Sequence, residues 1–294
     1  MTAVLLTKDL PRYAIKAGMQ GVQPLDWGLG LRPSLLSSSP PPQAAFPIKS
    51  DRLLASNSLE RVKHIYEGPD MQQHLLIDAD DTLWENNIYF EQAIEDFIDF
   101  LNHSSLKPHE VRAVLNEIEL TQGYGSASFA RSLRECYIHL AEKEVQDEDL
   151  ERVVYLGEQI LHQPMQVIAG VEETLAYLSP RHLLILLTKG HEEEQKLKIE
   201  NSGLGIYFVD TIIVEEKNVD TYNRLVTELD LDLENTWMIG NSPRSDINPA
   251  LKVGLNAVYI PHPHTWGREK QDIRHEGKGR LLTLDAFTEL HNHF

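Results

Sequence analysis

The chain has 294 residues, of which 41% are hydrophobic and 24% charged, and its net charge at pH 7 is −18. This length is sufficient for one large hydrophobic core or two smaller ones. The acidic balance argues against nucleic acid or an anionic membrane surface as partner, because both are bound through basic patches. Cys136 is the only cysteine, which excludes an intrachain disulfide and favours a reducing, cytoplasmic location.

Residues 1–70 differ from the rest of the chain in charge and pattern. They carry eight basic and six acidic side chains, so residues 71–294 have a net charge of −20. The stretch SLLSSSPPPQAAFP at 34–47 lacks helical or strand periodicity. We expect a disordered extension that is dispensable for chemistry, a weak partner-binding tail, or an upstream start chosen in place of Met71. Neither a secretory signal nor a membrane span is expected, because the apolar runs are too short.

From residue 71 onward, short apolar runs alternate with helix-like segments. Several runs are continuously apolar, which is typical of strands buried on both faces of a parallel sheet. The alternation predicts an α/β fold, a Rossmann-like doubly wound parallel sheet. The expected strands are HLLID (74–78), HLLILLT (182–188), FVDTIIV (208–214), TWMIGN (236–241) and NAVYIP (256–261), and the expected helices span 170–179, 191–202, 219–230 and 245–253.

One interval interrupts this alternation. Residues 88–163 contain four helix-like stretches and no convincing strand. We therefore predict an inserted α-helical cap domain at 88–163, while residues 71–87 and 164–294 form the catalytic core. The four stretches are FEQAIEDFIDFLNH (90–103), PHEVRAVLNEIEL (108–120), SFARSLRECYIHLAEK (128–143) and DEDLERVVYLGEQIL (147–161).

Polar side chains follow four of the expected strands. Ligands of open α/β sheets bind at the carboxyl ends of the strands, so these side chains are candidates for a common site. Carboxylates, a hydroxyl and ammonium groups at one edge suit a hard divalent cation with a phosphate held against it. The candidates are Asp78, Asp80 and Asp81; Thr188 and Lys189; Glu215, Glu216 and Lys217; and Asn241, Ser242 and Asp246.

The segment DADDT and its preceding apolar run resemble the first motif of the haloacid dehalogenase superfamily of phosphohydrolases. The resemblance extends from residue 71 to near the C-terminus, and four motifs occur in the expected order. It implies that Asp78 is the nucleophile and becomes an aspartyl phosphate. It further implies that Asp80 protonates the leaving group and then activates water, with crowding beside Asp78 expected to raise the pKa of Asp80.

The same resemblance assigns the remaining site residues. Thr188 and Lys217 match the hydroxyl and the lysine that bind the phosphoryl group, and the cofactor is expected to be Mg²⁺. The implied metal ligands are Asp78, Asp80, Asn241 and Asp246. Asn241 departs from the family pattern, which commonly has an acid after the glycine of the fourth motif, so metal affinity is expected to be reduced.

Several neighbouring residues compete for these roles. Lys189 and, less plausibly, Arg244 compete with Lys217, while Asp81 is interpreted as a structural neighbour. His262 and His264 in IPHPHTW raise a zinc hypothesis, although prolines flanking two histidines more often mark a rigid loop. The segment GYGSASFARSL (123–133) is either a lid loop facing the site or an ordinary interhelical turn.

These observations predict a Mg²⁺-dependent phosphatase acting on small phosphorylated metabolites. A haloacid dehalogenase uses the same nucleophilic aspartate without the second acid, and Asp80 argues against that alternative. A phosphomutase would share all four motifs. A non-catalytic binding or regulatory module is the alternative from a different class, and the Asp78/Asp80 pair argues against it. Oligomeric state is not indicated by the sequence.

Overall fold

The computed structural model describes residues 72–275 and 277–294, so the predicted N-terminal extension lies outside the described residues. Six parallel strands form one sheet in the order β3-β2-β1-β4-β5-β6. This confirms the predicted doubly wound α/β fold and adds one short strand, β6, that the sequence did not reveal. The strands are β1 His74–Ile77, β2 Leu183–Lys189, β3 Asp210–Val214, β4 Thr236–Gly240, β5 Asn256–Tyr259 and β6 Leu281–Thr283.

Strand β1 lies near the middle of the sheet and is buried on both faces. Leu75 and Ile77 pack on one face against α6 (Val171–Leu178) and η5 (Phe287–Asn292). Leu76 points to the other face and packs with α8 (Val219–Glu228) and α9 (Asn248–Val253). Alternate side chains of a strand point to opposite faces, so a continuous apolar run fills both layers. The residue that follows β1 therefore starts from a fixed position at the sheet edge.

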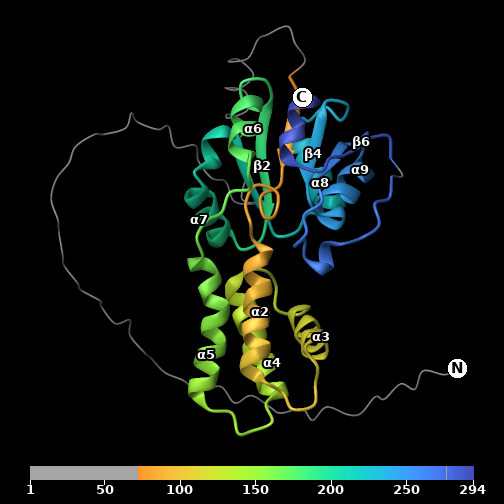
Figure 1. The fold of residues 1–294 in the computed structure, drawn as a ribbon. Coiled ribbons are helices and arrows are strands. Elements are labelled where there is room, and N and C mark those ends of the chain that lie inside the picture. The colour runs from red at the N-terminus through yellow and green to blue at the C-terminus, as the bar shows by residue number, and fades with distance from the viewer. Residues whose placement is uncertain (1–71, 276) are drawn as a thin grey trace, which may run out of the picture. The chain divides into compact units, whose positions relative to one another are not determined.

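Helices α2 to α5 follow β1 in the chain and lie together beyond one end of the sheet, as Figure 1 shows. They have a hydrophobic cluster of their own, which includes Phe97, Leu115, Leu133 and Val153. Helices α4 and α5 approach closely at Gly157, where an added Cβ would lie 2.6 Å from the Ala130 Cα. The helices are α2 Asn87–Leu101, α3 Pro108–Glu119, α4 Ser126–Leu140 and α5 Asp147–Glu158.

The segment after β4 departs from the regular helix expected at 245–253. A π-helical turn, Pro243–Ile247, precedes α9. The hydroxyl of Ser242 accepts a hydrogen bond from the Ser245 N–H and caps this turn. Wide turns of this kind are frequent at functional sites because they alter the direction of a few side chains.

Helix α7 (Glu192–Ser202) follows β2 and completes the elements that border the site. None of the helices within the described ranges combines the length and apolar character that a bilayer span requires.

Candidate active site

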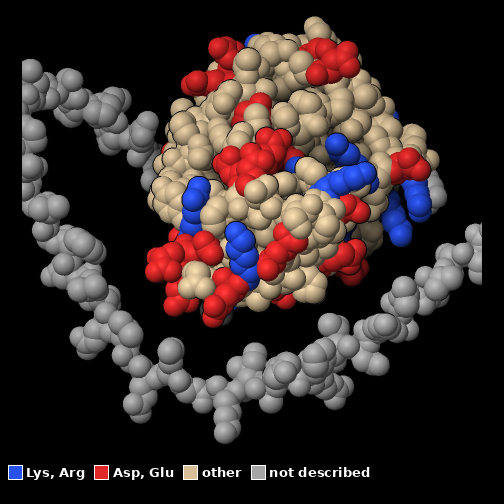
Figure 2. All heavy atoms as spheres, turned by 60° about the horizontal axis from the view of Figure 1, so that its bottom comes forward, with Lys and Arg blue, Asp and Glu red and all other residues tan. Residues whose placement is uncertain are grey.

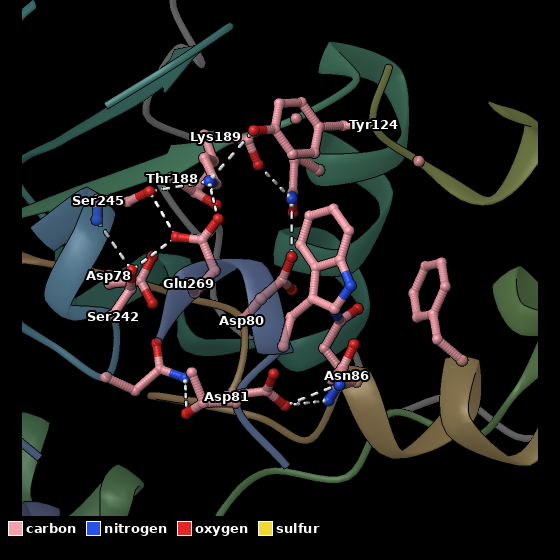
Figure 3. A pocket seen from close by; sticks show the side chains of 18 of the residues that line it. Asp78, Asp80, Asp81, Asn86, Tyr124, Thr188, Lys189, Ser242, Ser245 and Glu269 are labelled. Atoms are coloured by element: carbon pink, nitrogen blue, oxygen red, sulfur yellow. Dashed lines mark hydrogen bonds and ion pairs between the residues drawn. The ribbon is translucent and has the colours of Figure 1, made fainter. Parts of the chain in front are cut away.

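One pocket brings together the residues that the motif resemblance assigned to the site, whereas the strand-end candidates Glu215 and Glu216 do not line it. Asp78 and Asp80 follow β1, Thr188 ends β2, Lys217 follows β3, and the fourth motif follows β4. Helices α2 to α4 supply the opposite wall, so the pocket lies between the sheet edge and the inserted helices. Figure 3 shows the lining side chains directed toward one another.

Lys217 forms the most deeply buried contacts of this pocket. Its Nζ lies 2.5 Å from Asp78 Oδ1 and 2.7 Å from Asp246 Oδ1. The Thr82 hydroxyl donates to the second oxygen of Asp78 at 2.9 Å. Burial alone would lower the pKa of Lys217, but Asp246 and Asp78 outweigh it and raise the pKa. A charged lysine therefore stays beside the Asp78 carboxylate.

The carboxyl group of Asp246 is committed to protein contacts. One oxygen accepts from Lys217, and the other accepts the Ser242 backbone N–H at 2.9 Å. Gly240 makes this arrangement possible, because an added Cβ there would collide with the Asp246 side chain. Asp246 thus orients Lys217 and the loop after β4, and its assignment as a metal ligand stays a prediction.

Asp80 is turned away from Asp78 toward helix α7. Its carboxylate lies 3.1 Å from Lys198 Nζ and accepts hydrogen bonds from Gln195 Nε2 and Trp84 Nε1 at 2.9 and 2.8 Å. These contacts place its side chain among donors of α7 and Trp84, and the assignment of Asp80 as a metal ligand stays a prediction.

The pKa of Asp80 is lowered in this environment. Burial by itself would raise it, but the positive charge of Lys198 and the hydrogen bonds from Gln195 and Trp84 outweigh burial. The expectation that crowding beside Asp78 raises the pKa of Asp80 is therefore wrong for this geometry. The sequence could not show that Lys198, more than a hundred positions away, would approach this carboxylate.

Asp81 has a structural role at the start of α2. Its backbone φ is 59°, and its Oδ1 accepts the N–H groups of Asn86 and Asn87 at 2.9 and 3.0 Å. Side-chain acceptors at this position satisfy backbone donors that the helix leaves free. Burial is the main cause that raises the pKa of Asp81 to about 7, and these two bonds oppose it. These contacts agree with the prediction that Asp81 has a structural role.

Asn241 is buried in the pocket wall, with its amide fixed by a neighbouring loop. Its Nδ2 donates to Thr265 Oγ1 at 3.0 Å, and that hydroxyl donates to the His262 carbonyl. The bond uses the amide nitrogen, so the amide oxygen lies on the other side of the group. An amide oxygen is a suitable ligand for a hard cation.

The loop Gly123–Gly125 carries contacts from the inserted helices to the sheet edge. The Tyr124 hydroxyl donates to Glu216 Oε2 at 2.6 Å, and the Ser126 N–H donates to Glu194 Oε2 at 2.9 Å. Both glycines have positive φ, 83° and 94°, which L side chains rarely adopt. Tyr124 and Phe129 line the pocket, but residues from Ser126 onward belong to helix α4 and Phe129 also packs in the cluster of the inserted helices. The segment is thus an interhelical turn that faces the site, and a lid role stays a prediction.

The two histidines of the PHPH segment are 5.8 Å apart between ring centroids. The ring of His262 lies between two carboxylates, with Nε2 3.3 Å from Glu85 and Nδ1 3.8 Å from Asp81. These three residues are the group of possible metal ligands found in the described part of the chain. Burial lowers the pKa of His262 despite the neighbouring Glu85, and the zinc hypothesis for the histidine pair stays a prediction.

Comparison with known proteins agrees with the motifs. The model of the haloacid dehalogenase-like hydrolase family matches residues 73–254. This chain belongs to that family. The comparison with curated proteins found no match.

Solved structures of similar proteins show the breadth of this hydrolase family. A haloacid dehalogenase-like family hydrolase from Xanthomonas campestris is 33% identical, with a TM-score of 0.64, and the match covers 74% of this chain and 92% of that one. A 2-haloacid dehalogenase from Pseudomonas syringae pv. Tomato is 16% identical, covering 76% and 97%, with a TM-score of 0.50. A protein described as a predicted phosphoglycolate phosphatase from Haemophilus somnus is 15% identical, covering 76% and 98%, with a TM-score of 0.52. At these last identities the likeness concerns the fold alone.

Sequence reasoning missed Glu269 in the site of this hydrolase. Its Oε1 lies 2.7 Å from Lys189 Nζ, and its Oε2 accepts the hydroxyls of Ser242 and Ser245. Burial would raise the pKa of Glu269, but Lys189 and the two serines lower it to about 2. Glu269 lies ten residues after β5 and does not directly follow a strand end, so the strand-end pattern did not point to it.

Lys198 and Gln195 were also missed, although helix α7 itself was predicted. With Glu194 they stand at positions i, i+1 and i+4 of a helix and so share one face. A cluster of long polar side chains on the sheet-facing side of a helix is the signal that would have drawn attention to them.

Proposed function

We propose that this HAD-like hydrolase is a Mg²⁺-dependent phosphomonoesterase that acts on small phosphorylated metabolites. The observation that carries the proposal is the pair Asp78 and Asp80, in which the first carboxylate faces Lys217 and the second stands two residues away. A nucleophile and a separate proton donor are the two groups that cleavage of an unactivated phosphate ester requires.

Asp78 is the nucleophile in this proposal. A carboxylate oxygen forms a bond to phosphorus, the bond from phosphorus to the ester oxygen breaks, and an aspartyl phosphate results. Lys217, 2.5 Å from Asp78, offsets the repulsion between the carboxylate and the dianionic phosphate. Thr188, whose side chain is buried at the end of β2, provides a hydroxyl for a phosphoryl oxygen.

Asp80 donates a proton to the departing ester oxygen and takes one from the water that cleaves the aspartyl phosphate. To do this it must leave the position in which Lys198 and Gln195 hold it as an anion. Lys198 and Gln195 thus act through Asp80 and are positioning residues.

The lining of the pocket fits a hard divalent cation. Eight carboxyl groups and three lysines line it, so a phosphate dianion would enter an excess of negative charge. Figure 2 shows further acidic side chains at several places on the face toward the inserted helices, and their negative charge would also repel a phosphate dianion. Asp78 and Asn241 are the side chains that would hold the ion, and Asp246 would position Lys217 behind them. When bound, Mg²⁺ supplies positive charge for the phosphoryl oxygens.

Replacing Lys198 with methionine is expected to separate good from poor leaving groups. Alkyl phosphates need a proton on the departing oxygen, whereas para-nitrophenolate departs without one. Loss of Lys198 removes a charge that lowers the pKa of Asp80 and releases its side chain, so kcat should rise by about threefold or more for alkyl phosphates and change less for para-nitrophenyl phosphate. Lys196→Met is the matched control, because Lys196 is on the same helix and pairs only with Glu192 and Glu193. Equal changes in kcat for both substrates would show that Lys198 does not act through Asp80.

The proposed function is tested by measuring phosphate release from a panel of phosphorylated metabolites with Mg²⁺ and with EDTA. Turnover that requires Mg²⁺ supports the proposal. A complete absence of phosphate release across the panel would refute it and favour a non-catalytic module. A sugar phosphate that is isomerised without phosphate release would identify a mutase.

A dehalogenase is the second candidate, and Asn241 is the observation that favours it. An amide in place of an acid removes one negative charge from the metal side of the pocket. Chloride release from 2-haloacids in EDTA, without phosphatase activity in Mg²⁺, would establish this alternative.

A further inference from the structure

The pocket extends past the predicted phosphate site to a wall formed by the inserted helices. Phe90 and Ile94 of α2, Phe129 of α4 and the loop residue Tyr124 line this wall, and Trp266 lies beside Tyr124. Phe90 and Phe129 contact each other edge to face, with ring centroids 5.1 Å apart. This part of the pocket offers the group attached to the phosphate an aromatic and aliphatic surface.

The three lysines of the pocket all belong to the catalytic end. Lys217 contacts Asp78, Lys198 contacts Asp80, and Lys189 contacts Glu269. Each one is therefore already matched by a carboxylate of the core. No lysine or arginine of the described chain lines the pocket on the side of the inserted helices. A second negative charge on the substrate would find no cation in the lining of this wall, where Arg112 already pairs with Glu91.

Two carboxylates, Glu91 of α2 and Glu119 of α3, line the same wall. Glu91 forms an ion pair with Arg112 at 2.7 Å. Glu119, which is partly buried, forms no ion pair within the described residues. Burial is the main cause that raises the pKa of Glu119 to about 7, and the positive charges of Arg268 and Arg112 offset it only in part.

We infer that the substrate is a phosphate monoester whose leaving group carries an amine, with the ammonium bound by Glu119 and the adjoining carbon skeleton packed against Phe90 and Phe129. This inference rests on the proposed phosphatase activity and specifies its substrate class. The substrate ammonium would neutralise the Glu119 carboxylate, and the neighbouring aromatic rings would also attract it. An anionic leaving group would face Glu91 and Glu119 at close quarters.

Three phosphate esters of closely related phenols test the inference: those of tyramine, para-ethylphenol and para-hydroxyphenylpropanoate. They differ in the charge at the end of the side chain and share the reacting phenol. At about pH 8 in Mg²⁺, where carboxylates are ionised and the amine is charged, kcat/KM should be highest for the tyramine ester and lowest for the carboxylate ester. The ratio of kcat/KM for the tyramine ester to kcat/KM for the carboxylate ester should be about tenfold or more.

The variant Glu119→Gln should lower the ratio of kcat/KM for the tyramine ester to that for the ethylphenol ester by about tenfold, chiefly through KM. Glu117→Gln is the control, because Glu117 lies on the same helix, is exposed and does not line the pocket. The ratio is measured within one protein sample, so partial unfolding does not affect it.

The possible outcomes are distinct. Equal or better turnover of the carboxylate ester by the unaltered protein overturns the inference and leaves the phosphatase proposal standing. A ratio that Glu119→Gln leaves unchanged overturns the role of Glu119 as the amine-binding group. A failure of all three esters, together with failure of the metabolite panel, would instead refute the phosphatase proposal itself.

Discussion

Asp78→Asn is expected to lower turnover by at least about 10³-fold while the protein remains folded. The amide keeps the shape of the side chain but cannot attack phosphorus, and no aspartyl phosphate can form. The measurement is kcat with the best substrate of the phosphate-release panel, together with circular dichroism and thermal unfolding.

Asp99→Asn is the matched control for the nucleophile, because Asp99 is exposed on α2 and does not line the pocket. Its activity should equal that of the unaltered protein. If Asp78→Asn retains a tenth of the activity or more, Asp78 is not the nucleophile.

Lys217→Met is expected to have the largest effect on stability. Lys217 is 2% exposed and contacts two buried carboxylates, Asp78 and Asp246. Removing one member of a buried ion cluster leaves charge without compensation, and the free energy of unfolding should fall by about 3–5 kcal/mol. Urea unfolding monitored by tryptophan fluorescence measures this change.

Protonation should partly relieve this loss. Burial and the neighbouring Asp78 raise the pKa of Asp246 even with Lys217 present. Without the lysine, the carboxyl group should take up a proton more readily in the folded protein than in the unfolded chain, so lower pH favours folding. The stability deficit of Lys217→Met relative to the unaltered protein should therefore narrow as the pH falls from about 8 to about 5.

The double variant Lys217→Met/Asp246→Asn provides the control. It removes one of the two carboxylates that Lys217 compensates, so it should be more stable than Lys217→Met alone. A double variant that is no more stable would show that the buried charge is not the origin of the loss.

The sequence predicted the sheet because its strands are continuous apolar runs whose burial does not depend on distant partners. HLLID and HLLILLT are apolar at nearly every position, which is typical of strands buried on both faces of a parallel sheet. Strand β6 was missed because it has only three residues, none of them fully buried. The helix predicted at 245–253 corresponds to the π-helical turn Pro243–Ile247 followed by α9. The turn was not predicted because it depends on hydrogen bonds of Ser242 that have no periodicity in the sequence.

The site was predictable where a residue directly follows a strand. The carboxyl ends of parallel strands meet at one edge, which brought Asp78, Thr188 and Lys217 together without knowledge of the loops. The charge state of Asp80 was not predictable, since it depends on Lys198, whose contact is long-range. Glu269 ends the short 3-10 helix Gly267–Glu269, which has no sequence periodicity, and tertiary packing places it beside Lys189.

The hydrogen bonds of Asp81 tie the first turn of α2 to the motif that carries the nucleophile. Only a few residues separate Asp78, the proposed nucleophile, from the first helix of the insert, so a change at that junction is expected to affect both. Divergence toward new substrates is therefore expected to occur in the outer parts of α2, α3 and α4 that line the pocket. Substitutions in the five residues Asp78–Thr82 would disturb the site. Substitutions in the helices that follow can change the pocket wall and leave the motif residues in place.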